Sequence, residues 1–149
     1  MSNILFVKVK SQYDAMGNYE DEIAVVFQRL GHCVNIIDLV DKNAAQKMYA
    51  LAGKIDVLFS FNATFVGMQQ VKELFCRAKF VTYLCDHPLF HKSRLDQIGN
   101  DCIIFTCDQR HEQYIRCYYP NIKNVFFVPL SGSVAAEKML SNMKLNEYK

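Results

Sequence analysis

The sequence predicts an α/β fold, a Rossmann-like doubly wound parallel sheet of about six strands with helices on both faces. Six short runs rich in Val, Ile, Leu and Phe alternate along the chain with segments that have the three- and four-residue apolar spacing of helices. The apolar runs are nearly continuous, which is typical of strands that are covered on both faces. Strands that alternate with helices pair in parallel through right-handed crossovers.

The predicted strands are short, mostly apolar runs. The fourth of them stops abruptly at Cys85-Asp86-His87-Pro88, and the sixth is broken by Pro129. In chain order the six strands are residues 4–7, 34–39, 55–61, 80–84, 102–106 and 125–128.

The first predicted helix covers residues 18–30, because Ile23, Val26, Phe27 and Leu30 recur at helical spacing and Gly31 follows. The other predicted helices cover residues 43–51, 68–77, 93–98 and 109–118, and the last loop and helix run from Ser131 to Asn142. Asp108 is suited to cap the fifth helix, which Pro120 prevents from continuing.

Length and composition predict one globular domain over residues 1–149. Of the 149 residues 51% are hydrophobic, and the net charge of +2 comes from 17 basic and 15 acidic residues scattered along the chain. The sequence has no cluster of basic residues of the kind that would predict a nucleic-acid partner. No apolar run is long enough to cross a membrane, the start does not resemble a signal peptide, and the six cysteines form no C-x-x-C pair. We therefore expect a cytoplasmic protein with reduced thiols and no membrane span.

The loop after the first strand, residues 8–18, contains a single glycine, Gly17. A dinucleotide site would carry G-x-G-x-x-G here, and no GK[ST] motif is present, so neither NAD, FAD nor Walker-type nucleotide binding is expected. We expect no cofactor. The polar side chains of this loop could hold an uncharged or sugar-like ligand. The loop could equally be a solvated connector without a ligand. These side chains are Ser11, Gln12, Tyr13 and Asp14.

The polar loop after the fourth strand is the first candidate for a catalytic site, because ligands of open α/β sheets bind beyond the carboxyl ends of the strands. Asp86 and His87 have the residue types of a general base, although either could instead serve a turn or a cap. His91 follows in the same loop, and Asn62 and Thr64 end the third strand at the same edge.

Other interpretations of these loops stay open. Cys85, His87 and His91 could bind zinc together with Cys107 and His111, but such spacing is weak, and we expect no metal. Cys85 as a nucleophile would need a base from another loop. For Asp108 a helix cap is favoured over a ligand contact. The small residues around Gly132 would let a ligand or a second domain approach the backbone.

Four motifs carry a resemblance to a known family. They are Tyr83–Phe90, Thr106–His111, Tyr118–Asn121 and Val128–Gly132. In this order they resemble the N-terminal halves of bacterial GT-B glycosyltransferases, of the CgeB-like spore-maturation group and the family 1-like and family 4-like groups. The likeness covers nearly the whole chain.

This resemblance implies that residues 1–149 are the acceptor-binding N-terminal half of a two-domain enzyme. Such an enzyme transfers a sugar from a nucleotide sugar to an acceptor hydroxyl without a required metal. Its partners would be a carbohydrate or glycoconjugate acceptor and a C-terminal nucleotide-sugar-binding domain, and this chain alone would be inactive. By the same resemblance, Asp86 or His87 would be the base, and the 11–14 loop, Asn62 and Thr64 would position the acceptor. The alternative is a non-catalytic flavodoxin-like binding or regulatory module; a hydrolase is disfavoured because no G-x-S-x-G motif is present.

Overall fold

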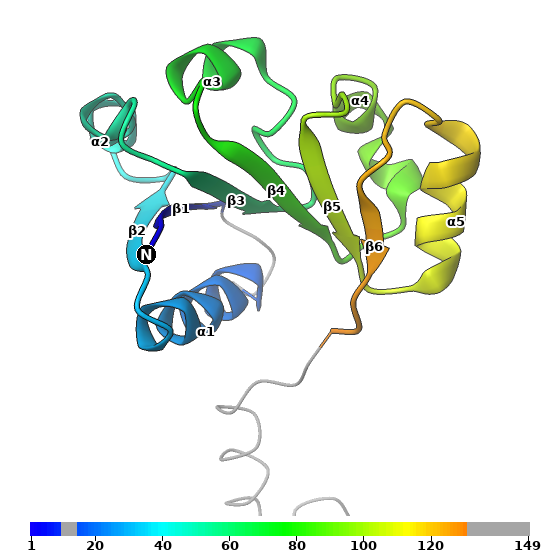
Figure 1. Cartoon of the computed structure of the whole chain (residues 1–149), viewed down its shortest axis with the longest axis horizontal. Helices are drawn as coiled ribbons and strands as arrows, with labels where there is room; N and C mark the ends of the chain where they lie inside the picture. Colours follow the sequence, from blue (N-terminus) through cyan, green and yellow to red (C-terminus); the bar gives the residue numbers. More distant parts are fainter. Residues whose placement is uncertain (10–14, 131–149) are drawn as a thin grey trace, which may run out of the picture.

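A computed structural model describes residues 1–9 and 15–130 of the chain, and in this part six parallel strands form one sheet. The strand order is β2-β1-β3-β4-β5-β6, so the predicted α/β fold with an all-parallel sheet is confirmed (Figure 1). The strands are β1 (Asn3–Lys8), β2 (Cys33–Asp38), β3 (Val57–Phe61), β4 (Lys79–Leu84), β5 (Cys102–Thr106) and β6 (Val125–Phe127).

The described helices divide unequally between the two faces of the sheet. They are α1 (Ala15–Arg29), α2 (Ala44–Leu51), α3 (Gln69–Leu74), the 3-10 turn η2 (Pro88–His91), α4 (Lys92–Leu95) and α5 (Gln109–Tyr118). Helix α1 contributes Ala24 to the apolar cluster on one face. Helices α2 to α5 contribute to the cluster on the other face, and Figure 1 shows α1 on the side of the sheet opposite to α2 and α3. The sheet is therefore doubly wound.

The chain reverses its direction of travel across the sheet between β1 and β3. It leaves β1 for the edge strand β2 through α1, and returns through α2 to pair β3 with the other side of β1. From β3 it continues outward to β6. The first five strands thus have the order 2-1-3-4-5 of flavodoxin-like sheets, with β6 added at the edge. In this topology the crevice between the carboxyl ends of β1 and β3 is the place where ligands bind.

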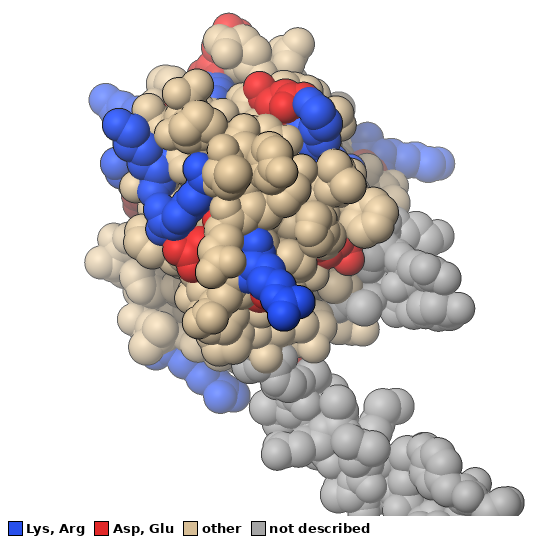
Figure 2. Space-filling view, turned by 90° about the vertical axis from the view of Figure 1, so that its right-hand side faces the viewer, with Lys and Arg blue, Asp and Glu red and all other residues tan. Residues whose placement is uncertain are grey.

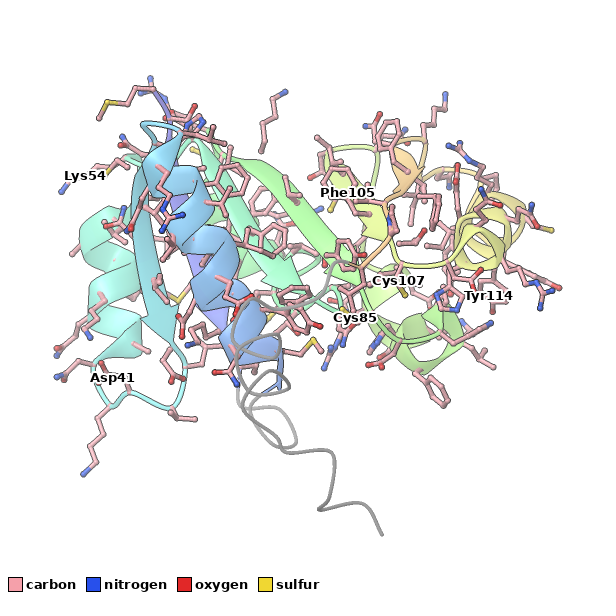
Figure 3. The ribbon with its side chains drawn as sticks, turned by 90° about the horizontal axis from the view of Figure 1, so that it is seen from below. Asp41, Lys54, Cys85, Phe105, Cys107 and Tyr114 are labelled. Atoms are coloured by element: carbon pink, nitrogen blue, oxygen red, sulfur yellow. The ribbon has the colours of Figure 1, made fainter. Side chains whose placement is uncertain are left out.

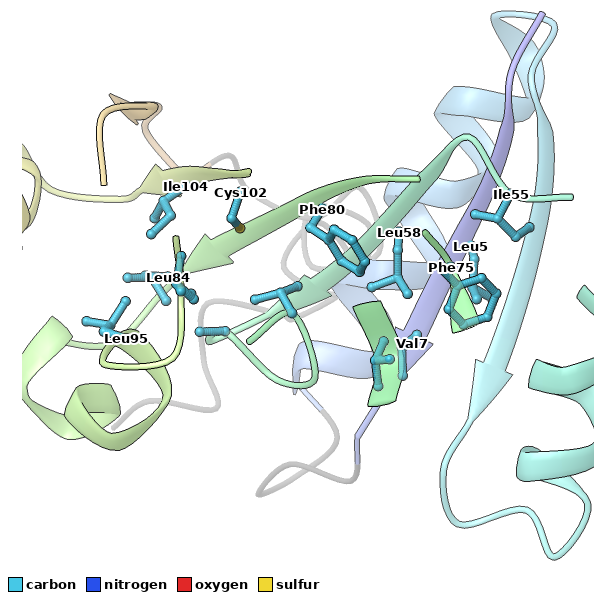
Figure 4. Packing of buried hydrophobic residues seen from close by; sticks show 14 of the residues in the cluster. Leu5, Val7, Ile55, Leu58, Phe75, Phe80, Leu84, Leu95, Cys102 and Ile104 are labelled. Atoms are coloured by element: carbon cyan, nitrogen blue, oxygen red, sulfur yellow. The ribbon is translucent and has the colours of Figure 1, made fainter. Parts of the chain in front are cut away.

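Alternate residues along each central strand enter the two cores. In β1, Leu5 and Val7 join the cluster under α2 to α5, whereas Ile4 and Phe6 join the cluster under α1. Figure 4 shows the first cluster, in which Leu5, Leu58 and Phe80 of neighbouring strands lie beside Phe75. Burial on both faces is the reason that the central strands are nearly continuous apolar runs.

The start of α1 and the segment after β4 differ from the prediction. Helix α1 begins at Ala15, three residues before the predicted start. Where a loop was expected, Pro88 begins the 3-10 turn η2, which leads directly into α4. Helix α4 ends at Leu95, earlier than the predicted end at residue 98. Proline is compatible with the first position of a helical turn, and the His87 Nδ1 atom accepts a hydrogen bond from Leu89 N at 3.2 Å.

Charged side chains of both signs lie among each other on the surface of the fold. On the face shown in Figure 2, acidic residues lie near basic ones, and uncharged residues surround these small groups. Helices long and apolar enough to span a bilayer are absent from residues 1–9 and 15–130.

Candidate functional site

A polar cavity opens at the carboxyl ends of β1 and β3, at the reversal point of the sheet. Its volume is about 250 Å³. Side chains from α1, from the loop after β3 and from the segment after β4 meet there, although these segments are far apart in the sequence. The residues that line it are Val9, Met16, Glu20, Phe61, Asn62, Thr64, His91 and Arg94. The predicted site residues Asn62, Thr64 and His91 are among them.

The loop that follows β3 has an unusual backbone. The backbone φ angles of Asn62, Ala63 and Phe65 are positive, at 53°, 56° and 68°. Residues other than glycine rarely adopt this region. Buried hydroxyl groups hold this backbone in place: Thr82 Oγ1 accepts a hydrogen bond from Ala63 N at 2.8 Å and donates one to Ser60 O at 2.9 Å. Strained backbone that the surroundings maintain is typical of functional loops.

Asn62 connects the ends of β3 and β4 through its side chain. Its Oδ1 atom accepts a hydrogen bond from Cys85 N at 2.9 Å, and its Nδ2 atom donates to Asp86 Oδ2, also at 2.9 Å. The Asp86 side chain is 59% exposed, so its carboxylate is held in a defined place and remains open to a ligand. The predicted base Asp86 is not among the residues that line the cavity, but it contacts two residues that are, Asn62 and His91.

His91 lies behind this carboxylate. Its imidazole Nε2 atom is 3.5 Å from Asp86 Oδ2, and the residue is 9% exposed. Burial, and then the positive charge of Arg94, lower the pKa of His91, while the Asp86 carboxylate opposes this shift. The lowered pKa favours the neutral imidazole, whose buried Nε2 atom lies near Asp86 but has no hydrogen-bond partner among the described residues.

Arg94 and Glu20 supply the charged groups of the cavity lining. Arg94 Nη1 donates to Asn62 O at 2.7 Å and to Thr64 Oγ1 at 3.2 Å, and Glu20 of α1 is 1% exposed. Sequence reasoning missed both. Glu20 could have been found, because it lies three residues before Ile23 on the apolar stripe of a predicted helix, where a charge is unusual. Nothing in the short segment around Arg94 marks it.

His87 has a different setting from Asp86. Its ring lies edge-on against His111, with the centroids 4.9 Å apart, and against Tyr114 at 5.2 Å. Its Nδ1 atom caps η2, as described above, and the ring is not part of the cavity lining. The His87 ring thus lies against α5, whereas the Asp86 carboxylate contacts Asn62 and His91 of the cavity lining. The role of either residue as a base stays a prediction.

Asp108 caps α5, as its position predicts. Its side chain accepts a hydrogen bond from Arg110 N at 2.7 Å. It stands at the carboxyl end of β5 and does not line the cavity. The remaining predicted ligand contacts, Ser11, Gln12, Tyr13, Asp14 and Gly132, lie outside the described residues.

The cysteines near the site are protonated thiols. Burial, together with Cys107 and Asp86, raises the pKa of Cys85 to about 12. Cys107 lies beside it, as Figure 3 shows, and donates from Sγ to Cys85 O at 3.1 Å. Because a thiolate is the reactive form, Cys85 is a poor nucleophile near neutral pH. Among the described residues, no three His, Cys, Asp or Glu side chains are grouped so that they could hold a metal ion, and all six cysteines are free.

The setting of His91 predicts a loss of stability in acid. Folding lowers the pKa of His91. Below about pH 6.5, His91 of the unfolded chain therefore binds a proton, whereas His91 of the folded chain binds one only at a lower pH. Stability therefore falls as the pH drops through this window and is unaffected above it. We expect His91→Gln to show a smaller decrease in melting temperature between pH 7 and pH 5 than the wild type. Parallel decreases would contradict this.

Comparisons with known proteins leave the site to be interpreted from its geometry. No family model matches the chain, and neither the curated proteins nor the solved structures contain a significant match to it.

Proposed function

We propose that this chain is the acceptor-binding N-terminal domain of a two-domain glycosyltransferase, and that the cavity at the reversal point receives the acceptor. The observation that carries the proposal is the Asp86 carboxylate, which is held by Asn62, a residue of the polar cavity lining, and which solvent still reaches. Sites of doubly wound sheets lie at this edge. The resemblance of the motifs around Asp86 to acceptor domains supports the same assignment.

The groups around the cavity suit a ligand that carries hydroxyl groups. A hydroxyl in the cavity can donate to the carboxylate of Glu20 and accept from the guanidinium of Arg94. The Asp86 carboxylate lies next to the lining, on the Asn62 side chain. Asn62 and Thr64 add neutral polar groups to the same wall. A polar cavity with donors and acceptors on several sides orients a small, uncharged, multiply hydroxylated molecule.

The proposed reaction moves one proton and one glycosyl group. Asp86 accepts the proton of the acceptor hydroxyl as the oxygen attacks the anomeric carbon of the donor sugar. The bond between the anomeric carbon and the acceptor oxygen forms, and the bond to the phosphate oxygen of the nucleotide breaks, so the nucleoside diphosphate leaves with the electron pair. The donor is supplied by a second domain. Asn62 keeps the carboxylate oriented, and the cavity walls position the acceptor.

A non-catalytic binding or regulatory module is the second candidate. The strand order 2-1-3-4-5 of the first five strands favours it, because flavodoxin-like sheets of this order serve several such roles. The cavity volume of about 250 Å³ is also small for a cofactor or a complete substrate.

Titration of the chain with methyl glycosides of glucose, galactose and mannose tests acceptor binding. We expect NMR shifts at the backbone and side-chain amides of Asn62 and at Thr64 with at least one glycoside, because these groups line the cavity. Asn62→Ala should weaken that binding by about tenfold or more, since it removes an oriented hydrogen-bonding group. The matched control Asn121→Ala alters an exposed residue outside the cavity and should leave binding unchanged.

The same titration separates the two candidates. UDP and GDP are expected to bind with dissociation constants above about 1 mM, because the donor site would lie on another domain. Absence of shifts with every glycoside, or tight binding of a nucleotide in the cavity, would contradict the proposed function.

A further inference from the structure

One half of the α1 face of the sheet carries no described helix. In the described chain, α1 is the only helix that contributes to the apolar cluster on this face, and the strands β1 to β5 supply most of the rest. Beyond α1 the face continues through Val81, Phe105 and Cys107, which are only partly buried. Figure 3 looks onto this face and shows Phe105 to one side of α1. Parallel sheets are almost always covered on both faces, and the described residues provide no covering layer over this half.

An apolar groove lies on the same face, beside α1. It has a volume of about 660 Å³ and runs between α1 and the ends of β4 and β6. Val25 and Val26 of α1 form one wall and are 43% and 53% exposed. Phe61 and Tyr83 of the sheet form the floor. An exposed apolar surface of this kind usually binds another apolar element.

The chain itself enters this groove after β6. Val128, Pro129 and Leu130 line it, and the Tyr83 hydroxyl donates a hydrogen bond to Val128 O at 2.6 Å. Residue 130, which lines the groove, is the last one described in this direction, and 19 residues follow it in the sequence.

The sequence of these residues has the pattern of an amphipathic helix. Ser133 is a suitable N-cap, and a stripe of apolar residues recurs at positions i, i+3, i+4 and i+7. The stripe consists of Ala136, Met139, Leu140 and Met143, and the charged Glu137, Lys138 and Lys144 lie off it. A helix over residues 133–145 would be about 20 Å long, close to the roughly 22 Å of the 15-residue α1.

We propose that residues 133–145 form a helix that packs in this groove beside α1, with Met139, Leu140 and Met143 against Val26 and Tyr83. This helix supplies the missing layer on the α1 face. The chain's own segment is favoured over a second copy, because its attachment at Leu130 gives it an effective concentration in the millimolar range. The proposal is independent of glycosyl transfer.

Hydrogen exchange on the full chain tests the proposal directly. In the wild type, the amides of residues 137–143 should exchange at least tenfold more slowly than in an unstructured segment. The double variant Met139→Glu/Leu140→Glu should remove this protection and lower the melting temperature by about 5–10 °C. The matched control Ser141→Glu/Asn142→Glu adds the same charge on the opposite side of the helix and should retain the protection, with a melting temperature within about 2 °C of the wild type.

A reciprocal pair of variants examines the groove from the other side. Val26→Glu places a charge in the groove and should also deprotect residues 137–143, although that segment is unchanged. Val40→Glu, at an equally exposed valine outside the groove, should not. The proposal is overturned if residues 137–143 are unprotected in the wild type. It is also overturned if their protection disappears on dilution together with a dimer seen by sedimentation, because a second copy then fills the groove.

Discussion

If the proposed function holds, Asp86→Asn is expected to lower kcat for glycosyl transfer by about 10²- to 10⁴-fold, the range of a lost general base. The substitution keeps the shape of the side chain, and its amide oxygen can still accept the 2.9 Å hydrogen bond from Asn62 Nδ2. The acceptor KM should therefore change little, because the loss falls on the step that removes the proton. Steady-state kinetics with a nucleotide sugar and a glycoside acceptor would measure this separation.

Two further variants make this experiment decisive. Asp96→Asn changes a carboxylate that pairs with Lys92 on the surface at 2.8 Å, and it should retain wild-type kcat. His87→Ala removes the other predicted base, whose imidazole faces His111 and Tyr114, and we expect a much smaller effect. If only His87→Ala lowers kcat, His87 rather than Asp86 is the general base. Unchanged kcat in both Asp86→Asn and His87→Ala would end the general-base proposal.

Phe6→Ala is expected to lower the free energy of unfolding by about 3–5 kcal/mol, the usual cost of deleting a fully buried aromatic ring. Phe6 is 0% exposed in the middle of β1. Its ring centroid is 5.0 Å from that of Phe59 on the neighbouring strand and 6.1 Å from that of Phe27 on α1. The variant would leave a cavity between α1 and the sheet that these neighbours fill only in part. Denaturant unfolding would measure the change.

The control for this prediction is Phe90→Ala. Phe90 is 80% exposed in η2, so the same substitution there should change stability by no more than about 0.5 kcal/mol. A loss below about 1 kcal/mol for Phe6→Ala would mean that α1 does not pack on the sheet as described.

The candidate site was predictable in part. The edge of the sheet and the residues Asn62, Thr64, Asp86 and His91 followed from the rule that polar loops after parallel strands meet at one edge. Their separate tasks did not follow from it. The Asn62 side chain reaches Asp86 across 24 positions of sequence, and this depends on the positive φ of Asn62, which no residue pattern indicates.

The difference between Asp86 and His87 shows the same limit. The two residues are adjacent in the sequence and equally plausible as bases. In the structure the Asp86 side chain contacts Asn62 and His91, which line the cavity, and the His87 ring lies against Tyr114 of α5. Side-chain direction in a loop depends on a few dihedral angles, and these are set by packing against the next helix rather than by residue type.

The amino-acid sequence alone determined the class of this fold, because the spacing of apolar residues depends on how each local segment is buried. A strand that is covered on both faces is a continuous apolar run, and a helix that is covered on one side has apolar residues every three or four positions. It also determined that Asp108 caps a helix, which is a local hydrogen bond. Only the tertiary structure decided that β3 pairs with β1, that α1 stands alone on its face in the described chain, and that Glu20 and Arg94 join one cavity. Those outcomes depend on contacts between residues distant in the chain, whose free energy no local pattern contains.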